Sequence, residues 1–400
     1  MKRYSEYKDS GVKWIGEIPG HWKICRTRYL CNINTGDKDT VMKEDNGKYP
    51  FYVRSPKIER INTFSYDGEA ILMAGDGVGA GKVFHYANGK FDYHQRVYNM
   101  HNICGVSGKF MFYFIRDQFH YAMEEKNAKS TVDSVRLPWL KAFPIAIPAQ
   151  EEQEAIVTYL DSKVDKIDEY ISIAEKKIAA LEELKQTIIA EAVTRGIHKD
   201  VPMKDSGVKW IGMIPEHWDC CKLKYFTRIK SGDALTNNAL SDTGKYKVYG
   251  GGDFMGFYDK YNVDANTILI GRVGARCGCV TITEEKAWAT DNALILIHFN
   301  INTKFLTYLL VAANLNSLSI SNAQPLITGS KVKDSFIPIP PLPEQQEIVS
   351  YLDSKVANIN QLCQAERSQI EKLKEYKQRL ISDVVTGKVK VTNDSLNGRV

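Results

Sequence analysis

The sequence predicts two tandem copies of a mixed α/β (α+β) domain, each followed by one long helix. Three observations lead to this prediction: a repeated edge motif, a second repeated motif within a helical segment, and a heptad pattern of apolar residues. The 400 residues also allow roughly two or three domains. The expected order along the chain is therefore domain, helix, domain, helix.

The repeats set the boundaries. Residues 8–16 recur letter for letter at 204–212, and both copies continue with Ile-Pro-x-His-Trp. The sequence Tyr-Leu-Asp-Ser-Lys-Val at 159–164 recurs at 351–356. Matches of this length at nearly equal spacing indicate an internal duplication. The segments we expect are domains at 1–148 and 200–343, helices at 149–199 and 344–390, and a C-terminal tail at 391–400.

Each domain combines short strand-like runs with one helix. Apolar runs at 70–74 and 267–270 are each followed by a glycine-rich turn, as expected for strands. Helices are expected at about 110–125 and 304–317. Outside their edges the two copies share little sequence, so we expect one scaffold that presents two different surfaces.

The two helical segments carry apolar residues spaced alternately by four and three positions, which is a heptad pattern. Helices with the same pattern pack on each other most simply. Because the second domain joins the end of the first helix to the start of the second, we expect an antiparallel coiled coil with a pseudo-two-fold axis. Lys185 and Lys377 fall on equivalent seam positions, where they either fix the register or extend to solvent. The apolar seam residues are Val164, Ile167, Ile171, Ile178, Leu181 and Ile188 in the first helix, and Val356, Ile359, Ile370, Leu373 and Leu380 in the second.

The composition excludes several classes of protein. Hydrophobic residues make up 44% and charged residues 25%, which is an ordinary globular mixture. The eight cysteines form no Cys-x-x-Cys pair, and no apolar run reaches the ~18 residues of a membrane span. We expect a cytoplasmic protein with reduced thiols and no metal site. The net charge of +5 allows an anionic partner without requiring one.

The glycine-rich turns share some features with phosphate-binding motifs. Residues 75–83 fail the Walker pattern at Asp76 and Val83, and a strand rather than a helix is expected to follow, so a simple turn is the better interpretation. The equivalent turn at 271–276 carries Arg272 and Arg276, which suit phosphate or guanine contacts. Solvated surface arginines are the alternative.

Catalytic motifs are missing from the sequence. The Pro340-Pro341 pair lies in an apolar context that does not fit an adenine methylase. The residue types of a nuclease site occur at Asp117, Glu124 and Lys126, but we expect these to be surface charges.

The histidines and tryptophans of the edge motif are expected to belong to the framework. His21 and His217 lie within the repeated motif, where packing is a simpler role than catalysis. The repeated tryptophans should lie in the core. They are Trp14, Trp22, Trp210 and Trp218.

Taken together, these motifs resemble the specificity (S) subunit of type I restriction–modification systems. The resemblance lies in the Gly-Val-Lys-Trp-Ile-Gly-x-Ile-Pro-x-His-Trp edge, the Glu-Gln-x-x-Ile-Val-x-Tyr-Leu-Asp helix entry, and the Val-Thr-Gly-Lys-Val ending at 385–389. The first helix departs from this ending, with Val-Thr-Arg-Gly-Ile at 193–197. The resemblance extends over essentially the whole chain.

The resemblance implies a non-catalytic, DNA-reading subunit. Each globular segment would be a target-recognition domain for one half of a bipartite, asymmetric DNA site. The coiled coil would set the spacing and dock two adenine methyltransferase subunits, and restriction subunits would join. This chain would hold no cofactor, whereas its partners would use S-adenosylmethionine, ATP and Mg²⁺. A stand-alone DNA methylase or nuclease, and a coiled-coil adaptor that binds only proteins, are the alternatives.

Candidate DNA-contacting residues are polar or aromatic groups in expected loops near the glycine-rich turns. In the first domain they are Arg54, Lys57, Arg60, Lys82, His94, Gln95, Arg96, Lys129 and Ser130. In the second they are Lys230, Tyr249, Arg272, Arg276, Asp291, Asn292, Gln324 and Lys331.

Overall fold

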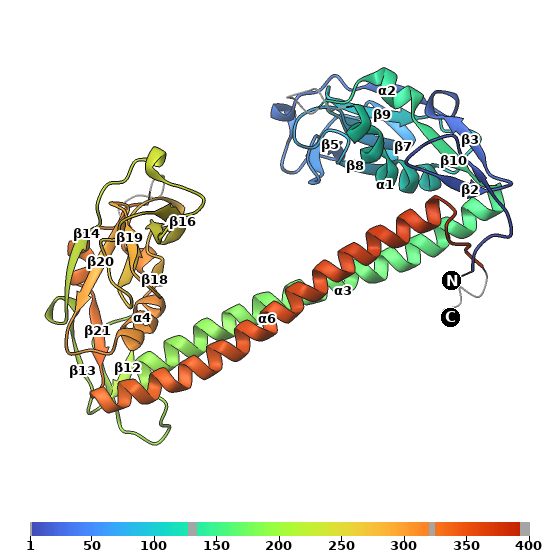
Figure 1. Ribbon diagram of the computed structural model, residues 1–400. Helices are drawn as coiled ribbons and strands as arrows, with labels where there is room; N and C mark the ends of the chain where they lie inside the picture. Colours follow the sequence, from blue (N-terminus) through green and yellow to red (C-terminus); the bar gives the residue numbers. More distant parts are fainter. Residues whose placement is uncertain (1, 127–133, 320–324, 393–400) are drawn as a thin grey trace. The chain divides into compact units, whose positions relative to one another are not determined.

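The computed structural model describes residues 2–126, 134–319 and 325–392 (Figure 1). They form two compact units, one made of Met1–Ala174 with Ser368–Val400 and the other of Glu175–Arg367. Two long helices contribute to both, so each unit holds one globular domain and part of each helix. Within the described residues, no helix has both the length and the apolar composition needed to cross a bilayer.

The domain of the first unit is built on a six-stranded sheet. Its order is β4 (Asn32–Thr35), β9 (Val97–His101), β7 (Tyr66–Ala74), β8 (Phe84–Tyr93), β5 (Tyr49–Tyr52) and β6 (Glu59–Ile61). All neighbours are antiparallel except β5 and β8. Helix α1 (Gly108–Lys126) packs on one face through Phe110 and Phe114, which are fully buried. The C-terminal half of β7, residues 70–74, is buried on both faces, which explains its continuous apolar run.

Short pairs of strands close this domain around its edge motif. β1 (Tyr7–Asp9) forms a hairpin with β2 (Glu17–Pro19), and β3 (Lys23–Arg26) pairs with β10 (Pro144–Ile147). Helix α2 (Leu137–Ala142) and two 3-10 turns, η1 (Thr27–Tyr29) and η2 (Thr40–Met42), complete the domain. Because β3 and β10 are its first and last strands after the hairpin, the domain is closed where the long helix begins.

The second unit repeats this plan with one break. A four-stranded sheet has the order β14 (Thr227–Ser231), β20 (Ala293–His298), β17 (Ile268–Gly271) and β18 (Val280–Ile282). A separate sheet has the order β16 (Asp253–Tyr258), β15 (Tyr246–Gly250) and β19 (Ala287–Ala289). The single strand β8 of the first domain thus corresponds to β18 plus β19.

The remaining elements of the second unit match the first. β11 (Met203–Asp205) pairs with β12 (Met213–Pro215), and β13 (Asp219–Lys222) pairs with β21 (Phe336–Ile339). Helix α4 (Thr303–Ala312) corresponds to α1. The short elements are η3 (Leu223–Tyr225), η4 (Asn237–Ala239), η5 (Gly274–Arg276), η6 (Leu315–Leu318) and α5 (Gly329–Lys333). The mixed α/β class and the tandem repeat predicted from the sequence are confirmed.

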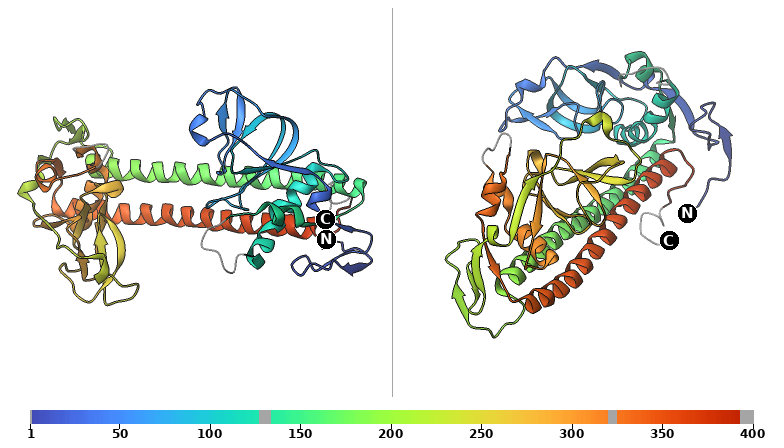
Figure 2. Two further views of the ribbon diagram at one scale, coloured as in Figure 1. Left: turned by 90° about the horizontal axis from the view of Figure 1, so that it is seen from above. Right: turned by 60° about the vertical axis from the view of Figure 1, so that its left-hand side comes forward.

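The long helices α3 (Gln150–Arg195) and α6 (Leu342–Val385) lie side by side in each unit (Figure 2). In the second unit Lys177 contacts Glu366 at 2.5 Å and Lys185 contacts Asn360 at 3.1 Å, so the helices are antiparallel there. Every apolar seam position named above is buried or half-buried.

Both helices end at a glycine that the edge motif confines. Gly387 has φ +72°, and a Cβ there would lie 2.4 Å from Pro19 Cδ. Gly196 has φ +74° and lies against Trp218 in the second unit. A left-handed glycine just after the last helical turn is a common helix ending. The extra Arg195 therefore moves the glycine one position further from the Val-Thr pair, and both endings keep a left-handed glycine.

The tryptophan expectation is only partly correct. Trp22 and Trp218 are fully buried, whereas Trp210 is 38% exposed and Trp14 is half-buried. Trp14 stacks on Phe143, at a ring-centroid distance of 5.3 Å, and on Tyr121. In the second domain Ser335 occupies the position of Phe143, so Trp210 lacks the ring on which Trp14 stacks.

Candidate nucleic-acid interface

A glycine-rich turn follows the central strand of each domain, and the two turns share one pattern of backbone hydrogen bonds. The Gly75 N–H donates to the Arg96 carbonyl at 2.8 Å, and the Arg272 N–H donates to the Asn292 carbonyl at 2.9 Å. Gly77 and Gly274 then both have positive φ, at +71° and +74°. The turns are therefore equivalent at an offset of 197 residues, and both are turns rather than phosphate loops.

A second loop beside each turn is equivalent as well. The His94 N–H donates to the Tyr52 carbonyl at 3.0 Å, and the Thr290 N–H donates to the Tyr249 carbonyl at 2.9 Å. Together, the turn, this loop and the segment after β5 or β15 form what we call the loop surface. It consists of residues 52–54, 75–82 and 94–96 in the first domain, and 249–251, 272–279 and 290–292 in the second.

The side chains on the two loop surfaces are different, although the backbone is shared. Arg54 and Arg96 of the first domain are replaced by Gly251 and Asn292 of the second. Conversely, Gly75 corresponds to Arg272. The two loop surfaces therefore share a backbone framework and present different donors and acceptors.

Asp76 organises the charges of the first loop surface, although it is not among the contact residues predicted from the sequence. Its carboxylate accepts from Arg54 Nη1 at 3.1 Å and from Arg96 Nη1 at 3.1 Å. Asp76 is half-buried, while Arg96 has 63% of its side chain exposed. Because a guanidinium has five N–H donors, both arginines keep donors for a ligand while Asp76 fixes their positions. An aspartate that precedes a glycine is common in turns, so the sequence pattern alone does not mark Asp76 as a functional residue.

His94 and Gln95 brace this surface. His94 is buried, and its Nδ1 accepts from the Arg96 backbone N–H at 2.9 Å. Burial, followed by the nearby Arg54 charge, lowers the pKa of His94. The Gln95 amide donates to Asp39 Oδ2 at 3.1 Å. His94 therefore shapes the loop, whereas Gln95 and Arg96 are exposed on it.

The structure places the other candidates of the first domain outside the centre of the loop surface. Lys57 pairs with Glu59 at 3.4 Å. Arg60 donates to the carbonyls of Gly47 and Lys48, which gives it a structural role. Lys129 and Ser130 lie outside the described residues.

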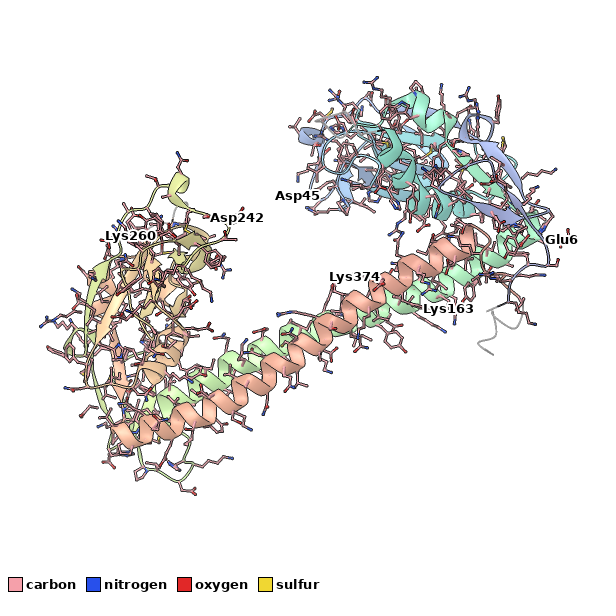
Figure 3. All side chains as sticks on the ribbon, in the orientation of Figure 1. Glu6, Asp45, Lys163, Asp242, Lys260 and Lys374 are labelled. Atoms are coloured by element: carbon pink, nitrogen blue, oxygen red, sulfur yellow. The ribbon has the colours of Figure 1, made fainter. Side chains whose placement is uncertain are left out.

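Lys82 lies at the end of the turn, beside the long helices. It lines a cavity of about 460 Å³ together with Arg116 of α1 and Lys374 of α6. Lys374 is labelled in Figure 3.

In the second domain, Arg272 and Arg276 lie on the loop surface. Arg272 Nη1 donates to Ser231 Oγ at 3.4 Å, and Arg276 Nε lies 2.7 Å from Asp253 Oδ2. Asp291 and Asn292 are exposed beside them.

The remaining candidates of the second domain are more dispersed. Tyr249 packs against an apolar cluster, and Lys331 donates to the Leu318 carbonyl at 3.0 Å. Lys230 lines a different cavity, of about 340 Å³, with Asn262 and His298. Gln324 lies outside the described residues.

The expectation that Asp117 is a surface charge is wrong. Only 3% of the residue is exposed, and its carboxylate accepts from the amides of Gln118 and Gln378. Burial raises the pKa of Asp117. The residue joins α1 to α6. Among the described residues, no three His, Cys, Asp or Glu side chains are grouped to hold a metal ion.

The edge motif and the helix entry of each unit meet at a glutamate. Glu152 Oε2 accepts from Trp22 Nε1 at 3.2 Å and lies 2.9 Å from His21 Nε2. This arrangement is repeated in the second unit, as a separate set. There Glu344 Oε2 accepts from Trp218 Nε1 at 3.0 Å and lies 2.8 Å from His217 Nε2.

A second anchor in each unit is an aspartate about two and a half helical turns after this glutamate. The Asp161 carboxylate accepts from Lys109 at 2.5 Å and from the Tyr113 hydroxyl at 2.8 Å. In the second unit Asp353 accepts from Lys304 at 2.6 Å and from Tyr308 at 2.8 Å. The repeated motifs thus fix each domain to its helix, which gives both loop surfaces a defined support.

Comparison with known proteins agrees with this organisation. Residues 19–183 and 215–372 match the type I restriction modification DNA specificity domain. The chain is 23% identical over 376 residues to the EcoDI specificity subunit of Escherichia coli, covering 86% of this chain and 83% of that protein. It is 25% identical over 433 residues to the MjaVIII specificity subunit of Methanocaldococcus jannaschii, covering 97% and 98%.

A solved structure has the same fold. It comes from work described as "Structural basis underlying complex assembly and conformational transition of the type I R-M system", and it matches with a TM-score of 0.68 at 16% identity over 93% of this chain and 99% of that one. The family domain matches most of the chain, in two copies, and the relatives match along nearly its full length. The chain therefore belongs to the specificity subunits of type I restriction–modification systems, which are the non-catalytic, DNA-recognising components of those complexes.

Proposed function

We propose that each domain binds one half of a bipartite, asymmetric DNA site through its loop surface. The observation that carries this proposal is the shared backbone pattern with different side chains. At equivalent positions the first domain presents Arg96 and the second presents Asn292. Arginine suits guanine and asparagine suits adenine in the major groove, so the half-sites should differ.

The paired helices would set the separation of the half-sites. Helix α3 has 46 residues and α6 has 44, so at ~1.5 Å per residue each is roughly 65–70 Å long. Their seam positions are covered, and Lys177–Glu366 and Lys377–Asp168 pairs link them. A continuous helix pair resists bending far better than a loop, which is what a spacer requires.

The outer faces of these helices are where two adenine methyltransferase subunits would dock. Several large apolar side chains lie off the seam and in solvent, including Tyr170 at 64%, Ile173 at 53% and Leu362 at 51% exposure. Several exposed apolar side chains on one helix pair indicate a surface that a protein partner covers. Restriction subunits would join the same complex. The partners would use S-adenosylmethionine, ATP and Mg²⁺, and the complex would act on DNA in the cytoplasm.

The test is reconstitution of the full chain with the methylation subunits of its own system. Methyl transfer to genomic DNA is mapped with and without the chain, and the expected result is one split motif that appears only with it. A variant with Arg96→Ala and Arg272→Ala should lose or relax that motif. A matched control with Lys90→Ala and Lys260→Ala, away from the loop surfaces, should retain it; Lys260 is labelled in Figure 3.

Other outcomes would favour the alternatives. Methylation by the chain alone would indicate a stand-alone methylase. A complex that assembles but shows no salt-sensitive, sequence-dependent DNA binding would indicate a protein-only adaptor.

A further inference from the structure

Val78 occupies the tip of the glycine-rich turn between β7 and β8, and it is 91% exposed. Single exposed apolar residues are common, so exposure alone indicates nothing. Val78 is distinguished by its position. It lies two residues after Asp76, whose carboxylate holds Arg54 and Arg96. An alkyl group thus projects from the most polar part of the first loop surface.

The turn that carries Val78 is held by its backbone. The Ala80 N–H donates to the Gly77 carbonyl at 2.9 Å, and the Gly81 N–H donates to the Ala74 carbonyl at 3.0 Å. Gly79 packs so closely on the segment after β5 that a Cβ would lie 2.5 Å from the Arg54 carbonyl oxygen. Val78 therefore has a fixed position relative to both arginines, and a contact made there loses little conformational entropy.

The second domain has an alkyl group at the same position. Ala275 lies at the offset of 197 residues, and it is exposed beside Arg276. The tip is thus apolar in both domains, while its neighbours change from Asp76 to Val273 and from Gly79 to Arg276. The alkyl group is therefore the side-chain feature that the two tips share.

We propose that Val78 contacts the 5-methyl group of one thymine in the first half-site, and so determines specificity at that base pair. This proposal rests on the function proposed above. The thymine methyl is the apolar feature that a side chain meets at base edges of the major groove. The arginines on Asp76 have the donors for adjacent phosphates or guanine, so an alkyl group on the same turn completes a reading surface for mixed sequence.

The experiment removes the methyl group from the DNA and from the protein separately. Each thymine of the mapped first half-site is replaced in turn by deoxyuridine, which pairs identically but lacks the methyl. Binding by the reconstituted complex is measured for the wild type, Val78→Ala and Val41→Ala. Val41, on η2 of the same domain, is 87% exposed and is the competing apolar contact.

We expect wild-type affinity to fall about three- to fivefold at one thymine, the change that corresponds to one buried methyl. With Val78→Ala the affinity for normal DNA should fall, and deoxyuridine at that position should then have little further effect. Val41→Ala should keep the wild-type sensitivity.

Three results would overturn the proposal: a first half-site without thymine, no wild-type sensitivity to deoxyuridine, or full sensitivity retained by Val78→Ala. Failure of the proposed function would look different, because the complex would then show no sequence-specific binding even to the normal thymine-containing duplex.

Discussion

The Lys377 ammonium lies 2.6 Å from the Asp168 carboxylate, so a cation on the seam of α6 is neutralised by an anion on α3. The equivalent lysine of the repeat, Lys185, donates to Asn360 Oδ1 at 3.1 Å. Only 17% and 16% of the two lysine side chains is exposed. Both lysines thus reach across to the partner helix, which favours a role in register over extension into solvent.

A double-mutant cycle with Lys377→Met and Asp168→Ala should give a coupling energy of about 0.5–1 kcal/mol, because Asp168 is half exposed and solvent screens the pair. Urea denaturation followed by far-UV circular dichroism measures it. The matched cycle with Lys185→Met and Asn360→Ala should give a smaller coupling. High salt should weaken only the first. A coupling of zero at low salt would show that Lys377 contributes through packing alone.

Glu152 should be among the most sensitive residues of the first unit. In Glu152→Ala the indole N–H of Trp22, a fully buried residue, loses its acceptor. We expect a loss of about 1–3 kcal/mol in the free energy of unfolding, the cost of one buried unsatisfied donor. Glu344→Ala is the matched change in the second unit, and limited proteolysis should show which unit opens in each variant. Losses below about 0.5 kcal/mol in both variants would contradict the anchoring role.

The lowered pKa of His94 predicts a loss of stability in mild acid. Its cause is burial first, followed by the Arg54 charge. Below the ordinary histidine pKa of 6.5, the unfolded chain binds a proton that the folded chain still refuses, so the unfolded state gains stability as pH falls. One such group contributes at most ~1.4 kcal/mol per pH unit.

The matched variant for this effect is His94→Thr, which installs the residue found at position 290 in the second domain. Urea denaturation at pH 7.5 and 5.5 should show a smaller drop in stability for the variant than for the wild type. A residual drop should remain, since the pKa values of His85 and His298 are also lowered by burial. An equal drop in both proteins would exclude His94 as a cause.

Repetition made the framework predictable from sequence. The edge motif and the helix entry are duplicated because His21, Trp22 and Glu152 contact one another, and the same trio recurs at 217, 218 and 344. The heptad spacing likewise identified the covered positions of α3 and α6, because a helix has one buried stripe whatever its partner.

The loop surfaces were less accessible to sequence reasoning, since their contacts join residues far apart in the chain. Asp76 meets Arg54 and Arg96 only because β9, β7, β8 and β5 follow one another in the sheet, an order that local patterns do not reveal. Asp117 was misjudged for the same reason: its partner Gln378 is 261 residues away. A charged residue on a helix is usually exposed, and Asp117 is buried only because α1 packs on α6.

Variants of Arg272 and Arg276 distinguish base contacts from phosphate contacts in the second domain. Arg272→Ala and Arg276→Ala should each be tested for base preference by methylation mapping of the reconstituted complex. A lost guanine contact costs about 1–3 kcal/mol and relaxes one position of the second half-site, while the first half-site is unchanged. Uniformly weaker, less salt-dependent binding in both variants would instead mean that these arginines contact phosphates.

The paired helices give the sharpest prediction about spacing. Four residues are inserted in α3 between Ala179 and Ala180, and four in α6 between Gln364 and Ala365, which are opposite in the register set by Lys177–Glu366 and Lys185–Asn360. Four residues are about one helical turn, so the seam rotates by only ~40° and the ~6 Å of added length is matched in both helices.

At ~3.4 Å per base step, the gap between the half-sites should lengthen by roughly two base pairs. Both half-site sequences should stay the same, because no loop-surface residue changes. Methylation mapping gives both readouts at once, and insertion in α3 alone is the control, since it mismatches the seam and should reduce stability. If the doubly inserted complex is active with an unaltered gap, the helices do not set the spacing. If a half-site sequence changes, the loop surfaces are not the independent readers that their separate side chains indicate.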